Sequence, residues 1–174
     1  MATASNVQVA KTGNFYGAPT GTALPTAHGA ALDAAFADMG YISESGVNRS
    51  TPQSTQEIKS FQNGDIVEEV ITSDKLTYAI EFMEDSENVR VAIDGNWTAG
   101  AVEIKGGVNT RQSWCFDFVM SNERTKRIVI PDGKITAKGD TSYVNGNAVI
   151  YPVTITCFPD GSGNKAYEYT EQPA

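Results

Sequence analysis

The sequence predicts a mainly β protein, a β-sandwich or partial barrel of about eight or nine strands with one or two short helices. Two stretches, residues 76–82 and 112–121, alternate large apolar residues with smaller or polar ones. Strict alternation is typical of half-buried strands, because successive side chains point to opposite faces. The 16 glycines and 7 prolines favour a turn-rich chain. The 174 residues fit a single domain with a sizeable core.

The N-terminal part of the sequence, residues 1–30, consists mostly of small and polar residues. Such a segment cannot bury much apolar area, so we expect an extended N-terminal arm, either loose or ordered on a neighbouring subunit. After it, Leu32, Phe36 and Met39 recur at i, i+4 and i+7, which predicts a short helix over residues 30–39.

A polar loop is predicted at residues 47–55, and loops of this length without local structure are often functional. It is followed by a β-branched stretch at residues 66–72 and by the alternating stretch at 76–82. Ser73-Asp74 lies between these two stretches and has the size and chemistry of a tight turn. The sequence therefore predicts a central β-hairpin with its turn at this dipeptide.

A short helix is predicted directly after the hairpin. Asp85 or Ser86 can cap its start, and Asp94-Gly95 ends it. Its apolar residues recur at i, i+3 and i+4: Val89, Ala92 and Ile93.

The C-terminal half is predicted to consist mainly of strands. These lie at residues 101–105, 112–121, 127–131, 134–136, 148–158 and 165–170. The Pro-Asp-Gly sequence at residues 131–133 indicates either a turn or a bulge. Asn145-Gly146 is a strong hairpin signal.

Charge and composition exclude some functions. The net charge is −8, which argues against a protein that grips nucleic acid, because phosphate binding needs clustered Lys and Arg. An acidic surface is compatible with nucleic acid sliding past it, although acidity more often serves only solubility. No run approaches the roughly 18 apolar residues of a membrane helix, and we expect no signal peptide at the N-terminus.

Catalytic chemistry finds little support in the residues. His28 is the single histidine and is expected to be solvent-exposed and silent, because it lacks a base-orienting motif. Cys115 and Cys157 fall in strand patterns and are expected to be buried small thiols. The sequence therefore predicts no enzyme, no cofactor and no metal site.

One calcium-like spacing is present but incomplete. Asp160, Ser162 and Asn164 match positions 1, 3 and 5 of an EF-hand loop, and Glu171 matches position 12. Lys165 replaces the glycine that position 6 requires, and no helices flank the loop. A Pro-Asp-Gly turn is the favoured interpretation.

An ordered set of motifs resembles a known family. The motifs are GYISESGV (residues 40–47), STQEIKSFQNGDIVEEVIT (54–72), EFMEDSENV (81–89), RIVIPDGKIT (127–136) and VIYPVTITCFPDG (149–161). Together they resemble the major tail tube protein of long-tailed, non-contractile, siphovirus-type bacteriophages, over residues 12–170.

The resemblance implies a structural virion protein. Members of this family form hexameric rings that stack into a hollow tube, which conducts DNA into the host. The implied partners are further copies of the chain, the tape measure protein, the distal tail protein and the tail terminator. DNA would pass through the lumen without specific binding. The implied location is the virion tail, after synthesis in the host cytoplasm.

Alternation assigns side chains to the two faces of the tube wall. If the apolar residues face the core, then Thr77, Glu81 and Asp117 point to the opposite face, which is either the lumen or the outer surface of the tube. Four residues of the polar loop are expected to contact the adjacent ring: Asn48, Arg49, Ser50 and Gln53.

A second hypothesis is a monomeric β-sandwich module that binds carbohydrate or a receptor. Its binding platform would be formed by Trp97, Trp114 and Tyr151. Sizing chromatography would separate the two hypotheses, because the module would remain a single small species.

Overall fold

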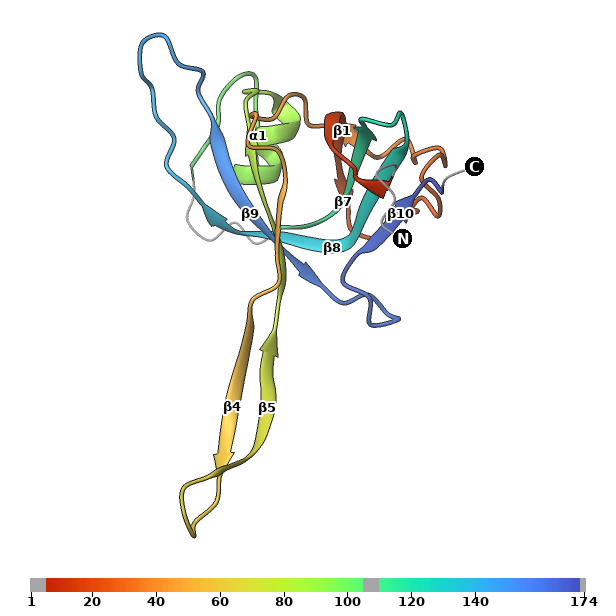
Figure 1. The fold of residues 1–174 in the computed structure, drawn as a ribbon. Helices are drawn as coiled ribbons and strands as arrows, with labels where there is room; N and C mark the ends of the chain where they lie inside the picture. The colour runs from red at the N-terminus through yellow and green to blue at the C-terminus, as the bar shows by residue number, and fades with distance from the viewer. Residues whose placement is uncertain (1–5, 105–109, 173–174) are drawn as a thin grey trace.

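A computed structural model describes residues 6–104 and 110–172 of the chain. Within these ranges the protein has ten strands and one helix, which confirms the predicted mainly β fold (Figure 1). The elements are β1 (Ala10–Pro19), β2 (Ala37–Asp38), β3 (Asn48–Ser50), β4 (Gln53–Lys59), β5 (Ile66–Asp74), β6 (Leu76–Phe82), α1 (Glu87–Asp94), β7 (Arg111–Met120), β8 (Thr125–Lys138), β9 (Tyr151–Phe158) and β10 (Tyr167–Thr170).

Eight strands form one curved antiparallel sheet in the order β2-β1-β7-β8-β9-β6-β3, with β10 added to β8. The 14-residue strand β8 belongs to two walls of the sheet. Its first part pairs with β7 and β10 in one wall, and its second part pairs with β9, next to β6, in the other. The sheet folds over so that β6 faces β7, although the two strands are not neighbours in it. The ends of the order, β2 and β3, do not pair with each other, so the sheet stays open.

The main core lies between the two walls. Along β6 every second residue is buried, and the alternating set of β9 faces the same interior. Tyr78 meets Phe116 edge to face at 6.0 Å between ring centroids, and Phe82 stacks on Trp114 at 6.4 Å. The predicted alternation of both stretches therefore gives the buried faces of two opposing strands.

A second apolar cluster covers the other side of β7. Its buried members are Ala18, Phe36, Cys115 and Val129. Because both faces of β7 are covered, Ser113 and Cys115 are as buried as Trp114.

The two N-terminal predictions are wrong in part. Residues Ala10–Pro19 form β1 inside the large sheet, and Phe15 is 4% exposed, so this part of the expected arm does bury apolar area. Residues 30–39 form no helix; Ala37 and Asp38 pair with β1, and Met39 donates its backbone N–H to the Phe15 carbonyl. Tertiary pairing here outweighs the local helical pattern.

The predicted helix after Phe82 is confirmed as α1. The Ser86 side chain accepts a hydrogen bond from the Val89 N–H, and Gly95 ends the helix with φ = 80°. Val89, Ala92 and Ile93 are buried in the main core. In the described ranges, no helix has the length and apolar character needed to cross a membrane.

The central hairpin differs from the prediction. β5 pairs with β4, and only Lys75 separates β5 from β6, so the chain runs on past Ser73-Asp74 without turning back. The turn lies instead at residues 60–65, where the Ser60 N–H binds the Asp65 carbonyl and Gly64 has φ = 72°.

The C-terminal strands largely agree with the prediction. The Pro-Asp-Gly sequence at 131–133 is a bulge inside the continuous strand β8. Gly133 is needed there, since an added Cβ would lie 2.8 Å from the Trp114 ring. Asn145-Gly146 turns within a long β8–β9 loop. At the predicted strand 101–105, Ala101 makes only an isolated bridge to Thr98, and Lys105 lies outside the described residues.

Candidate assembly surfaces

The hairpin β4–β5 projects away from the body of the molecule (Figure 1). Its two strands pair with each other and form a separate two-stranded sheet. Six large apolar side chains on it are exposed: Ile58, Phe61, Ile66, Val67, Val70 and Ile71. A two-stranded hairpin is only marginally stable alone in water, and this one has no core of its own. Its apolar side chains are free to pack against another chain.

The base of the hairpin is fixed to the body. The Lys165 ammonium donates to the Asp74 carbonyl oxygen at 2.7 Å and lies 3.2 Å from the Asp74 carboxylate. The Lys75 N–H donates to the Pro52 carbonyl, which continues the ladder between the hairpin and the β3–β6 pair. These contacts attach the base of the hairpin to the edge of the sheet.

A polar face covers the outside of β6, β9 and the second part of β8. Thr77 pairs with Thr156, Ala79 with Thr154, and Glu81 with Pro152. All of these side chains are partly exposed. The Thr136 and Thr156 hydroxyls bond each other at 2.7 Å, and Glu81 accepts from the Ser43 hydroxyl at 2.5 Å. We call this surface the threonine face; it carries the predicted residues Thr77 and Glu81.

Asp117 lies on the other wall. Its carboxylate binds the Arg127 guanidinium through two hydrogen bonds, of 2.5 and 2.7 Å. Arg127 is 6% exposed and also donates to the backbone carbonyls of Ala27 and Ala30. The hydrogen bonds to Asp117 raise the pKa of Arg127 above its usual range. Asp117 thus neutralises a buried cation and does not lie on the threonine face.

The residues predicted for the inter-ring loop are structured. Asn48, Arg49 and Ser50 form β3 on the edge of β6, and Gln53 begins β4. The Arg49 guanidinium lies 2.7 Å from the Glu168 carboxylate of β10. These residues remain exposed at the root of the projecting hairpin.

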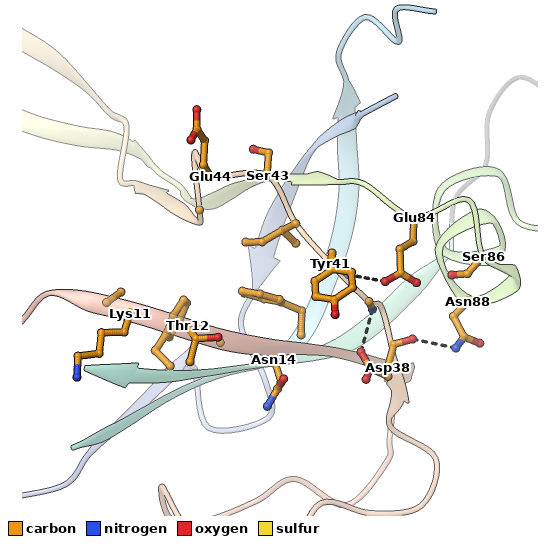
Figure 2. A pocket seen from close by; sticks show the side chains of 17 residues that line it. Lys11, Thr12, Asn14, Asp38, Tyr41, Ser43, Glu44, Glu84, Ser86 and Asn88 are labelled. Carbon is orange, nitrogen blue, oxygen red and sulfur yellow. Dashed lines mark hydrogen bonds between the residues drawn. The ribbon is translucent and has the colours of Figure 1, made fainter. Parts of the chain in front are cut away.

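A groove of about 740 Å³ opens beside β1, between residues 10–15 of that strand and residues 40–44 (Figure 2). Residues around the start of α1 and Phe118 of β7 complete it. The Tyr41 N–H donates to the Glu84 carboxylate at 2.9 Å, and Asp38 also lines the groove (Figure 2). We call this surface the β1 groove. The groove depends on β1, whose small and polar residues predict a loose arm, so the sequence pattern does not reveal it.

The thiols and the histidine show no reactive arrangement. Burial raises the pKa of Cys115 and of Cys157 to about 12 each, so both remain protonated thiols at neutral pH. His28 is half-buried, with Nδ1 2.8 Å from the Thr125 hydroxyl, so the expectation that it is solvent-exposed is not met.

The calcium-like residues serve a turn. One Asp160 carboxylate oxygen accepts the Ser162 and Asn164 N–H groups, and the other accepts from the Tyr167 hydroxyl. Glu171 accepts from Thr125. The described residues contain no group of three or more His, Cys, Asp or Glu that could hold a metal ion.

The aromatic platform of the second hypothesis is not formed. Trp114 is 1% exposed and Tyr151 is 6% exposed, so both rings belong to the core. Trp97 is partly buried after α1.

Comparison with protein families agrees with an assembly role. The model of the family described as "Phage tail tube protein" matches residues 1–173, almost the entire chain. A comparison with curated proteins gives no match. With nearly its full length matched, the chain belongs to the phage tail tube protein family, whose members are structural proteins of the virion tail.

Proposed function

We propose that this tail tube protein assembles into hexameric rings that stack into a hollow tube, and that the tube conducts DNA into the host. The main support is the projecting hairpin β4–β5, because six exposed apolar side chains on a hairpin without a core favour burial by neighbouring copies. Burying one fully exposed Phe such as Phe61 contributes about 2 kcal/mol. Short open strands at the sheet ends, β2 and β3, would be covered in such a ring.

The threonine face is the wall that we propose for the lumen. Its side chains are mostly short and uncharged, so they offer few groups that would trap phosphates. Its charges include Glu81, which repels phosphates, and Lys134, the partner of Thr156 on β8. A ring of six copies would carry six times the net charge of −8. Asp117 is already paired with Arg127, so we assign it a role in holding the second wall together and not in the lumen.

The root of the hairpin is the region that we propose for contact with the adjacent ring, together with Asn48, Arg49, Ser50 and Gln53. Tape measure, distal tail and terminator proteins would act on the ends and the lumen of the tube. This part rests on the family resemblance and on the exposure of these residues.

Hydrogen exchange tests the contact between rings. We expect amides of residues 48–59 and 66–74 to exchange much more slowly in sedimented tubes than in the dilute monomer. Amides in the turn at residues 160–164, which lies away from the hairpin tip, serve as the control. Equal exchange rates of the hairpin in monomer and tube would show that it is not an interface.

A further inference from the structure

The sequence contains two Asn-Gly dipeptides, and both lie in exposed turns. Asn63-Gly64 lies at the tip of the β4–β5 hairpin, and Asn145-Gly146 lies in the β8–β9 loop, residues 139–150. The hairpin and this loop project from the body in opposite directions (Figure 1). The two dipeptides are chemically the same, so a difference in their reactivity comes mainly from the fold.

An asparagine side chain can react with the backbone of the residue that follows it. The backbone nitrogen loses its proton and forms a bond to the side-chain carbonyl carbon, the C–N bond of the side-chain amide breaks, and ammonia leaves. Water then opens the resulting five-membered succinimide to aspartate or isoaspartate. A following glycine favours this ring closure, because it has no side chain and its backbone is the least restricted.

The reacting nitrogen is free at the loop dipeptide. Within the described part of the chain, neither the Gly146 N–H nor the Asn145 side-chain amide has a hydrogen-bond partner. One backbone bond closes the turn, from the Asn147 N–H to the Val144 carbonyl, and it is 3.2 Å long. An added Cβ on Gly146 would meet no atom within 4 Å, so the body of the protein does not pack against the turn there.

The corresponding nitrogen at the hairpin tip is held. The Gly64 N–H donates to the Ser60 carbonyl at 3.1 Å, and the Ser60 N–H donates to the Asp65 carbonyl at 2.8 Å. The Gly64 nitrogen must lose its proton and turn toward the Asn63 side chain, so its hydrogen bond has to break before the ring can close. A two-stranded hairpin opens at times, so this bond slows the reaction without abolishing it.

We propose that Asn145 is a site of spontaneous deamidation in the folded protein, and that the hairpin turn protects Asn63 from the same reaction. Conversion adds one negative charge to the net charge of −8. Asp140 is the one charged residue of the loop at 139–150, so the new carboxylate doubles the charge of this loop. The inference concerns the monomer and does not depend on the proposed assembly.

Peptide mass spectrometry tests the proposal on the dilute native protein, incubated at mildly alkaline pH. The mass change from amide to carboxylate reports conversion at each asparagine, and labelling by an isoaspartate methyltransferase reports the isoaspartate product. The same incubation in urea gives the ratio of the two rates without the fold. We expect Asn145 to convert at least fivefold faster than Asn63 in the native protein, relative to that ratio. A native ratio that equals the ratio in urea, or a faster Asn63, would overturn the proposal.

Matched variants give an independent readout by ion-exchange chromatography. We expect the aged wild-type protein to develop an acidic species that elutes with Asn145→Asp or close to it. Asn145→Gln should remove this species, because a glutamine would have to form a less favourable six-membered ring, whereas Asn63→Gln makes the same change in the other dipeptide and should leave it. Persistence of the acidic species at the wild-type rate in Asn145→Gln would contradict the assignment.

Discussion

Phe82 of β6 stacks on Trp114 of β7 across the core, with ring centroids 6.4 Å apart and ring planes 25° apart. Neighbouring residues along a strand point to opposite faces, so Glu81 and Cys115 turn away from this contact in opposite directions. Two strands that face one core cannot present their polar sides to one channel. This relationship separates Glu81, on the threonine face, from Asp117, on the other wall.

The first prediction concerns stability. We expect Asp117→Asn to lower the free energy of unfolding by about 3 kcal/mol, because it leaves the buried Arg127 without its carboxylate. Glu81→Gln keeps an acceptor for the Ser43 hydroxyl and should cost at most about 1 kcal/mol. Urea unfolding of both variants measures the difference, and equal losses would show that Asp117 does not balance a buried charge.

The second prediction concerns DNA passage. We expect Glu81→Lys to give tubes of normal appearance that deliver DNA poorly, because lysines in the lumen would bind phosphates. Glu87→Lys changes the charge equally but lies at the start of α1, away from the threonine face. Phage particles carrying either variant can be compared for DNA ejection. Normal ejection with Glu81→Lys would place the threonine face outside the lumen.

The third prediction concerns the thiols. Cys115 and Cys157 are buried, and desolvation raises the pKa of each to about 12, so few thiolates form at pH 8. We expect both to react with a thiol reagent at least 100-fold more slowly in the native protein than in urea. Fast reaction of one thiol in the native state would show that its strand opens readily.

The fourth prediction concerns acid. The hydrogen bond from Arg90 lowers the pKa of Asp85 below its ordinary value of 3.8. The carboxylate therefore stabilises the fold at pH values above 3.8, and this contribution is lost as the pH falls through the lower folded pKa.

We expect Asp85→Asn to be less stable than the wild type at pH 7 and the difference to shrink toward pH 2, as measured by urea unfolding. The effect should be modest because Asp85 is half exposed. A difference that stays constant over this range would show that the charge of Asp85 is not involved.

Much of the core could be predicted from local pattern. Alternation located β6, β7 and β9, and the capping pattern located α1, because burial on one face leaves a direct mark on the sequence. The walls that these strands form were not predictable, since the pairing of β6 with β9 and the fold of β8 through both walls are long-range choices.

The wrong predictions for β1 and for the hairpin turn also concern strand pairing that the local pattern does not show. β1 is rich in small residues, and close packing needs a glycine at position 13: an added Cβ on Gly13 would lie 2.5 Å from the backbone carbonyl oxygen of Asp117. Asn63-Gly64 is a hairpin signal at the true turn, whereas Ser73-Asp74 lies between two strand-like stretches that do not pair with each other. The β1 groove is lined by β1 and therefore could not be foreseen from a segment that reads as a loose arm.

Electron microscopy of concentrated, purified protein tests the account most directly. We expect hollow tubes of stacked rings with sixfold symmetry in end views, and their loss when residues 59–65 are replaced by a short Asn-Gly turn. A uniform monomer of 18.6 kDa that forms neither rings nor tubes at any concentration, or with tail extracts as seeds, would contradict the central claim.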